Sequence, residues 1–195
     1  MSARKVPKKI VLTGGPCAGK TTIAEVLSRA YAGDIVVVPE AASTLFNGGF
    51  PRWPERESRA ALQRSVYRVQ NELEVVYRAH HPNQLLVLDR GTVDGAAYWP
   101  DGPDAFFQTM QTSLEAELGR YHQVIYLESA GEEAYLIHGK RNPNRTETWA
   151  EARHLDELTR ALWEKHPAMT VIPNQRAFSE KISAVLRIVE QAMTA

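Results

Sequence analysis

A glycine-rich stretch with one lysine and two threonines follows the first apolar run of the chain. It has the form G-x-x-x-x-G-K-[ST], with Gly14, Gly19, Lys20 and Thr21 at the fixed positions. Glycines let such a loop curl so that backbone N–H groups point inward, and a helix N-terminus behind it adds partial positive charge. In this pattern the lysine ammonium reaches the β- and γ-phosphates of a nucleotide, and the Thr21 hydroxyl holds Mg²⁺.

The stretch therefore predicts a phosphate-binding loop, although a glycine turn that merely joins a strand to a helix would have a similar sequence. The residues expected to contact the nucleotide are Gly14, Gly15, Pro16, Cys17, Ala18, Gly19, Lys20, Thr21 and Thr22.

Two carboxylates are expected beside this loop, because each follows an apolar run. Asp89 closes the run LLVLD, where a carboxylate supports Mg²⁺ through water or through the Thr21 hydroxyl. A solvated aspartate that caps the next turn is the alternative. Glu40 follows another run, and a carboxylate there can accept the proton of an attacking hydroxyl and orient its oxygen. A glutamate that only starts a helix is the alternative for Glu40. Asp94 competes with it as the base or as a ligand of a substrate hydroxyl.

The residue after Asp89 separates subclasses of nucleotide-binding protein. Motors of the AAA+ type place a glutamate there to activate water, whereas this chain has Arg90. The NKxD element with which GTPases read guanine is not found in the sequence. The pair Asp-Arg at this point is similar to that of nucleoside and other small-molecule kinases, and Arg90 is expected to bind the substrate.

Residues 130–146 are charged and loop-like, and we expect them to form a lid. Pro143 prevents a continuous helix through Arg141 and Arg145, so these cations are expected on a closing segment. Negative charge gathers on the equatorial phosphate oxygens during phosphoryl transfer, and an arginine delivered by a lid stabilises that charge and excludes water. A solvated basic loop is the alternative.

A mixed set of aromatic and polar residues is expected to hold a second, small ligand. Aromatic rings beside a few amide and guanidinium groups suit a flat heterocycle with a hydroxylated sugar. Core aromatics and solvent-facing polar residues would give the same pattern. The set comprises Phe46, Phe50, Arg52, Trp53, Arg59, Gln63, Tyr67, Tyr98 and Trp99. Asn174, which follows the last apolar run, is expected to frame the nucleotide base, with a plain turn as the alternative.

The composition, with 44% hydrophobic and 24% charged residues, is typical of a globular protein, and residues 1–195 are expected to form one domain. The 23 Lys and Arg residues balance the 23 Asp and Glu residues, so the net charge gives no reason to expect a nucleic-acid or membrane partner. The single cysteine, Cys17, cannot form an internal disulfide, which favours the reducing cytoplasm. It is expected to be a small loop residue, with a reactive thiol as the alternative. A homodimer stays open.

Five short apolar runs alternate with helical patterns, as in an α/β fold with a parallel sheet. Strands are expected at 9–13, 35–38, 84–88, 124–127 and 169–172, and long helices at 55–80, at 148–165 and after 175. A further helix is expected to present Phe107, Met110, Leu114 and Leu118 on one face, and the helix at 55–80 to bury a stripe of Leu62, Val66, Val69, Leu73 and Val76. Because ligands bind at the carboxyl ends of strands in an open parallel sheet, the phosphate loop, Glu40 and Asp89 should meet there.

Four motifs together resemble the NadR-like AAA domain family: GGPCAGKTT at 14–22, PEAA at 39–42, DRG at 89–91 followed by DGAAYW, and RNPNR at 141–145. That family contains the ribosylnicotinamide kinase domain of bacterial NadR proteins and GTP-binding relatives in animals. The resemblance spans almost the whole chain. It implies a phosphate-loop NTPase fold of the nucleoside-kinase type that binds ATP or GTP, with a five-stranded, mostly parallel sheet flanked by helices and a lid loop.

These observations predict a Mg²⁺-dependent kinase that moves the γ-phosphoryl group of ATP, or of GTP, to a hydroxyl of a small metabolite such as a nucleoside. The residues expected to carry catalysis are Lys20, Glu40, Asp89, Arg141 and Arg145. Those expected to bind the acceptor are Glu40, Arg59, Gln63, Arg90 and Asp94, and Thr21 and Asp89 are the expected metal ligands. The alternative function is a nucleotide-binding regulatory protein that hydrolyses ATP or GTP slowly and signals by loop closure.

Overall fold

Residues 8–138, 147–174 and 177–194 are described by the structure, a computed structural model. Five strands form one sheet: β1 Lys9–Thr13, β2 Ile35–Val38, β3 Leu85–Asp89, β4 Gln123–Leu127 and β5 Met169–Ile172. Neighbouring strands pair in parallel, in the order β2-β3-β1-β4-β5. The expected α/β fold with a five-stranded parallel sheet is confirmed, and each strand lies within one residue of its expected bounds.

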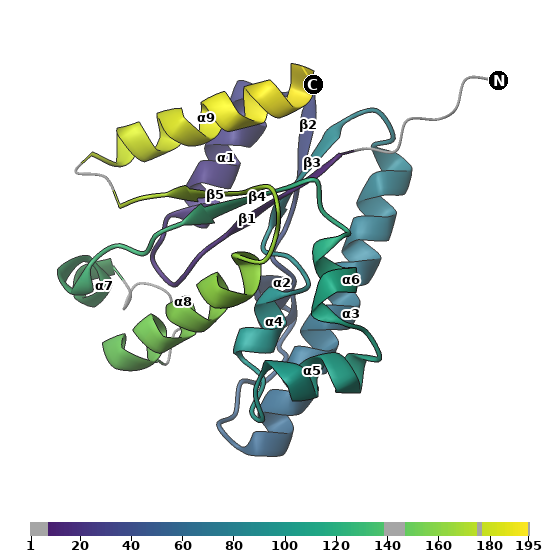
Figure 1. The fold of residues 1–195 in the computed structure, drawn as a ribbon, viewed down its shortest axis with the longest axis vertical. Helices are drawn as coiled ribbons and strands as arrows, with labels where there is room; N and C mark the ends of the chain where they lie inside the picture. Colours follow the sequence, from purple (N-terminus) through teal and green to yellow (C-terminus); the bar gives the residue numbers. More distant parts are fainter. Residues whose placement is uncertain (1–7, 139–146, 175–176, 195) are drawn as a thin grey trace.

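Helices cover both faces of this sheet (Figure 1). The helices on one face are α1 Lys20–Ala30 and α9 Phe178–Thr194, and those on the other are α3 Arg56–His80, α4 Asp94–Ala97, α5 Pro103–Met110, α6 Leu114–Leu118 and α8 Trp149–Trp163. Successive side chains of a strand point to opposite faces, so Ile10 and Leu12 enter one core cluster while Val11 packs with Trp163 in the other. Burial on both faces explains why the strands are continuous apolar runs.

The sheet register brings the chemistry-bearing residues to one edge. Leu12 pairs with Asp89 and Val38 pairs with Leu88, so β1, β2 and β3 end at the same level. The phosphate loop leads from β1 into α1, and Glu40 leads from β2 into α2 (Ala41–Asn47). The carboxyl edge of the sheet therefore gathers the phosphate loop and both carboxylates, as expected for an open parallel sheet.

Some helices differ from the expected ones. The expected single helix that would carry Phe107 and Leu118 is two helices, because Gln111 takes a left-handed φ of 56° and the Ser113 side chain caps α6. Helix α7 (Glu132–His138) lies in a segment expected to be a loop, and α2 and α4 have no counterpart among the expected elements. The expected apolar stripe of α3 is wrong at its C-terminal end, since Val76 is 59% exposed.

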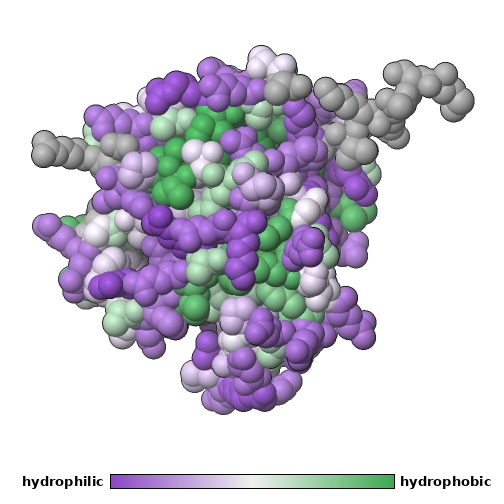
Figure 2. Space-filling model, viewed as in Figure 1, coloured by the Kyte–Doolittle hydropathy of each residue, from purple (hydrophilic) through white to green (hydrophobic). Residues whose placement is uncertain are grey.

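The surface is mixed in character. In the view of Figure 2, hydrophilic residues cover most of the face, and hydrophobic ones form smaller groups between them. The exposed large apolar side chains include Trp53 and two adjacent pairs, Val75 and Val76 on α3 and Leu136 and Ile137 on α7 (Glu132–His138). Among the described helices, none combines the length and the apolar character that crossing a bilayer requires.

Candidate active site

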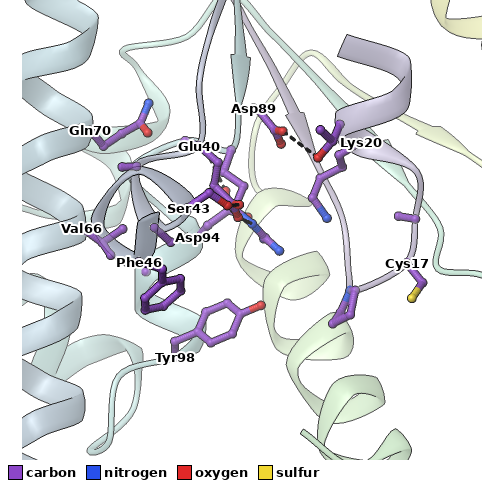
Figure 3. A pocket seen from close by; sticks show the side chains of 18 of the residues that line it. Cys17, Lys20, Glu40, Ser43, Phe46, Val66, Gln70, Asp89, Asp94 and Tyr98 are labelled. Atoms are coloured by element: carbon purple, nitrogen blue, oxygen red, sulfur yellow. Dashed lines mark hydrogen bonds and ion pairs between the residues drawn. The ribbon is translucent and has the colours of Figure 1, made fainter. Parts of the chain in front are cut away.

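A cavity of about 650 Å³ opens at the carboxyl edge of the sheet (Figure 3). Its walls come from the phosphate loop and the start of α1, from α2 and the middle of α3, and from the segment after β3. In Figure 3 Lys20 and Asp89 lie on one side, and Glu40, Ser43 and Asp94 lie nearer the centre. Small-molecule pockets typically measure about 300–1,000 Å³. One cavity of ordinary size thus joins the phosphate loop to the carboxylates.

Close approach of other elements explains the glycines of the phosphate loop. Gly14 has a φ of +133°, and a Cβ there would lie 2.1 Å from the carbonyl oxygen of Leu127. Gly19 has a φ of +89°, and a Cβ there would lie 2.5 Å from the Phe178 ring. Cys17, which is half-buried, also takes a left-handed φ of 60°. Only a residue without a side chain fits both the backbone angle and the space at Gly14.

Lys20 is buried within this loop. Its Nζ donates to the carbonyl oxygens of Gly14 and Gly15, at 2.8 Å in each case. Burial, together with the positive charge of Arg90, lowers the pKa of Lys20 to about 8. The ammonium form still predominates at neutral pH, so the loop offers a full positive charge to an anion.

Thr21 and Asp89 form the pair that could hold a divalent cation. The Thr21 hydroxyl donates to Asp89 Oδ2 at 3.2 Å, and Asp89 Oδ1 is buried without a hydrogen-bond partner within the described ranges. Burial and the negative charge of Glu40 raise the pKa of Asp89 to about 6. The residues that the structure describes contain no group of three His, Cys, Asp or Glu side chains that could bind a metal by itself. A carboxylate and a hydroxyl fit Mg²⁺ held jointly with phosphate oxygens and water.

Glu40 lies across the cavity from Lys20 (Figure 3). Arg90 Nε donates to Glu40 Oε1 at 2.7 Å, and the Ser43 hydroxyl donates to Oε2. Although burial raises it, the pKa of Glu40 lies below its usual range, because the Arg90 guanidinium and the Ser43 hydroxyl stabilise the carboxylate. Glu40 is therefore an ionised, oriented carboxylate at neutral pH.

Asp94 is held by donors at both of its oxygens. Oδ1 accepts from Thr13 Oγ1 at 2.6 Å and from Arg90 Nη1 at 2.8 Å. Oδ2 accepts from the Gly91 backbone N–H at 3.0 Å and from Trp163 Nε1 at 3.2 Å. Because four donors occupy a carboxylate that is only 4% exposed, the geometry suits an anchor for Arg90 better than a proton acceptor.

Arg90 bridges the two carboxylates. Its guanidinium forms ion pairs with Glu40 and Asp94 and lies 5.8 Å from the centroid of the Tyr98 ring. Its backbone takes a φ of 72°, which is costly for a residue other than glycine. Such strain persists where the surrounding structure over-determines it, and it gathers at functional sites. The two ion pairs supply that constraint here.

Part of the expected acceptor set lines the cavity: Phe46, Arg52, Gln63, Tyr67 and Tyr98. The Arg52 guanidinium lies 5.7 Å from the centroid of the Phe46 ring and forms an ion pair with Glu147, which also lines the cavity. Aromatic faces beside polar groups suit a flat heterocycle.

The other aromatic members of the set lie outside the cavity lining. Trp53 is 61% exposed, Trp99 packs into the core, and Phe50 does not line the cavity. Arg59 is exposed as well, and its guanidinium donates to the Tyr98 carbonyl oxygen at 3.4 Å. None of these four residues therefore contributes to the lining of the cavity.

Asn174, expected beside the nucleotide base, does not line the cavity either. Its backbone N–H donates to Glu128 at 3.1 Å. Arg141 and Arg145, expected on the lid, lie outside the described residues.

The residues that line the cavity without having been expected there include Ser43, Gln70, Thr92 and Phe178. Ser43 lies one helical turn after Glu40, so the two side chains meet once α2 forms. Phe178, at the start of α9, covers Gly19. Gln70 follows Gln63 and Tyr67 at helical spacing, which places it on the same side of α3. The sequence gives no local signal for Thr92, because its position depends on packing with residues far along the chain.

Comparisons with known proteins agree with this geometry. A family model described as an AAA domain matches residues 9–181. The comparison with curated proteins finds no match. Two similar solved structures are of deoxyadenosine kinase from M. mycoides. The structure with bound dATP has 13% sequence identity and a TM-score of 0.65. The structure with the products dCMP and a flexible dCDP has 12% sequence identity and a TM-score of 0.66. Each likeness covers 94% of this chain and 99% of the other, and at such identity it shows a shared fold. Because the family model spans most of the chain, the protein belongs to the AAA domain family, as the sequence motifs indicated.

Proposed function

We propose that the protein is a kinase that transfers the γ-phosphoryl group of ATP to a hydroxyl of a nucleoside-like metabolite, with Mg²⁺ as the cofactor. The observation that carries the proposal is the ionised Glu40 carboxylate, which shares one cavity with the phosphate loop. Among the described residues Glu40 makes no hydrogen bond to Thr21 or Asp89, the pair proposed to hold the metal, so it is not assigned to binding of the donor. It does suit a base for an attacking hydroxyl.

In the proposed reaction Glu40 accepts the proton of the acceptor hydroxyl. The hydroxyl oxygen forms a bond to the γ-phosphorus while the bond to the bridging oxygen of ADP breaks, so ADP leaves as the acceptor becomes a phosphate ester. Arg90 and Ser43 hold the Glu40 carboxylate in one orientation, which favours an aligned hydroxyl. Asp94 acts through Arg90, which it anchors.

Lys20, Thr21 and Asp89 are proposed to serve the phosphate donor. The Lys20 ammonium would stabilise charge on the β- and γ-phosphates, and Thr21 and Asp89 would hold the metal. When bound, Mg²⁺ neutralises charge on these phosphates. Arg141 and Arg145 stay predicted to stabilise the transferred group.

A nucleoside is the proposed class of acceptor for two reasons. The rings of Phe46, Tyr67 and Tyr98 line the cavity beside polar side chains, which suits a heterocycle with a hydroxylated sugar. The similar solved structures are of an enzyme that is named for its action on a nucleoside. ATP is the proposed donor, with GTP as the alternative in the same assay.

Acceptor-dependent release of ADP tests this proposal. A panel of nucleosides should contain at least one that raises the rate of ADP release from Mg-ATP. Glu40→Gln should lower that stimulated rate by about 10²–10⁴-fold, the usual contribution of a general base, with ATP affinity nearly unchanged. Glu25→Gln, on the exposed surface of α1, is the matched control and should behave as wild type. Slow hydrolysis that no acceptor stimulates would instead support a regulatory NTPase.

A further inference from the structure

Gln70 is a polar side chain buried against the wall of the cavity. It lies in the middle of α3, is 3% exposed, and lines the cavity beside Tyr67. Its Nε2 donates to Glu74 Oε1 at 3.3 Å, and within the described part of the chain no donor reaches its Oε1. Figure 3 shows this oxygen turned toward the cavity and the nitrogen turned away from it.

Glu74 determines which end of the Gln70 amide faces the cavity. It is 3% exposed and accepts hydrogen bonds from Lys9 Nζ at 2.9 Å, from Arg120 Nη2 at 2.9 Å and from the Tyr121 hydroxyl at 3.0 Å. Although burial raises it, the pKa of Glu74 lies below its usual range because Lys9 and Arg120 stabilise the carboxylate. An ionised carboxylate can only accept, so the amide nitrogen must face Glu74 and the carbonyl oxygen is left for the cavity.

Tyr67 repeats this arrangement one turn earlier in α3. Its hydroxyl donates to Glu117 Oε1 at 2.7 Å. Glu117 is 3% exposed and also accepts from the Thr92 and Thr112 hydroxyls, at 2.6 and 2.8 Å. The Tyr67 hydroxyl and one N–H of the Gln70 amide thus donate to buried carboxylates, and the second Gln70 N–H belongs to the nitrogen that is turned away from the cavity in Figure 3. This part of the wall offers the cavity oxygens that accept and no N–H or O–H that donates.

We infer that the wall formed by Tyr67 and Gln70 selects acceptors whose heterocycle carries an amino group over those with a carbonyl oxygen at the same position. The inference rests on the proposed function for the class of acceptor, and it adds the polarity of the group that is recognised. A carbonyl oxygen against Gln70 Oε1 places two acceptors together without a proton between them. Binding is weakened because both oxygen atoms are then buried without a hydrogen-bond donor. Glu74 is then a positioning residue that acts through Gln70.

Matched pairs of nucleosides test the inference: adenosine against inosine, and cytidine against uridine. Calorimetry measures binding of each, and ADP release measures turnover. Wild type should bind the amino member of at least one pair about tenfold more tightly or better. Gln70→Met keeps the length of the side chain without its amide and should bring the ratio of the two affinities in each pair close to one. Glu74→Gln lets the Gln70 amide turn over and should narrow the ratio, whereas Glu72→Gln, exposed on the same helix, should leave it unchanged.

Because Glu74 also pairs with Lys9 and Arg120, Gln70→Met gives the answer even where Glu74→Gln fails to fold. The inference is overturned if wild type shows no preference for the amino member of a pair or prefers the carbonyl member, or if the preference survives in Gln70→Met. Failure of every nucleoside to bind also overturns it. Binding with the expected preference but without stimulated ADP release supports the inference and removes the proposed function. Stimulated ADP release without a preference for the amino member supports the proposed function and overturns the inference.

Discussion

Replacing Asp94 with asparagine tests whether this carboxylate anchors Arg90. The Gly91 N–H and the Trp163 indole donate to Oδ2, and neither can reverse its direction. We therefore expect the amide oxygen at the Oδ2 site and the amide nitrogen at the Oδ1 site, where the ion pair with Arg90 now measures 2.8 Å. The Thr13 hydroxyl can turn and accept, whereas the guanidinium cannot. Arg90 thus loses one of its two carboxylate partners.

Removing one partner of a buried ion pair costs about 3–5 kcal/mol when the remaining charge is left alone. Because Glu40 still neutralises Arg90, we expect about 2–3 kcal/mol for Asp94→Asn, which lowers the Tm of a chain of this size by roughly 4–12 °C. Differential scanning calorimetry measures the shift. If Asp94 is an anchor and not the base, this variant should also keep more acceptor-stimulated activity than Glu40→Gln.

The matched control is Asp101→Asn, which removes a carboxylate from an exposed pair with Arg56 and should change the Tm very little. Equal Tm values for Asp94→Asn and Asp101→Asn would refute the anchoring argument. A loss of stimulated activity in Asp94→Asn as deep as in Glu40→Gln, with ATP binding intact, would instead point to Asp94 as the base.

Two further predictions concern the phosphate loop. Because the pKa of Lys20 is lowered to about 8, affinity for Mg-ATP should fall as the pH rises past that value, since the deprotonated amine carries no charge. Calorimetry in two buffers of different ionisation enthalpy should also detect proton uptake on binding of Mg-ATP near pH 8, and this uptake should be missing in Lys20→Met. An affinity for Mg-ATP that is constant from about pH 7 to 9 would contradict the prediction. Gly14→Ala should destabilise the protein more than Gly33→Ala does: both residues have positive φ, 133° and 98°, but only at Gly14 does a Cβ meet backbone, 2.1 Å from Leu127. Left-handed strain costs about 1–2 kcal/mol at either site. The contact between the added Cβ and the Leu127 backbone should cost about 1–3 kcal/mol or more in addition at Gly14. Urea unfolding measures the free energy of unfolding of each variant, and equal decreases for Gly14→Ala and Gly33→Ala would contradict the reasoning.

The strands and the phosphate loop were predictable because their signals are local. A strand buried on both faces must be apolar along its length, and Lys9–Thr13 and Met169–Ile172 have the bounds expected from their residues. The fixed spacing of the loop follows from sterics at Gly14 and from the start of α1, which are both encoded within a few residues. The position of Glu40 at the same edge then follows from strand order and parallel pairing.

The remaining features depend on contacts between distant parts of the chain. Glu74 looks like a solvent-facing helix residue, yet it is buried because Lys9 and Arg120 supply charges from β1 and from the segment before β4. The break between α5 and α6 lacks a glycine, since Gln111 itself takes the left-handed conformation. Neither feature has a pattern that composition or periodicity could reveal.

The most direct test of the central claim, that Glu40 serves transfer of a phosphoryl group to an organic hydroxyl, is phosphorus NMR of the reaction. With Mg-ATP and an acceptor that stimulates ADP release, wild type should build up a phosphate ester of the acceptor in step with ADP, and Glu40→Gln should form that ester at least about a hundredfold more slowly. If inorganic phosphate accumulates in place of the ester, or if Glu40→Gln forms the ester at the wild-type rate, the claim is contradicted.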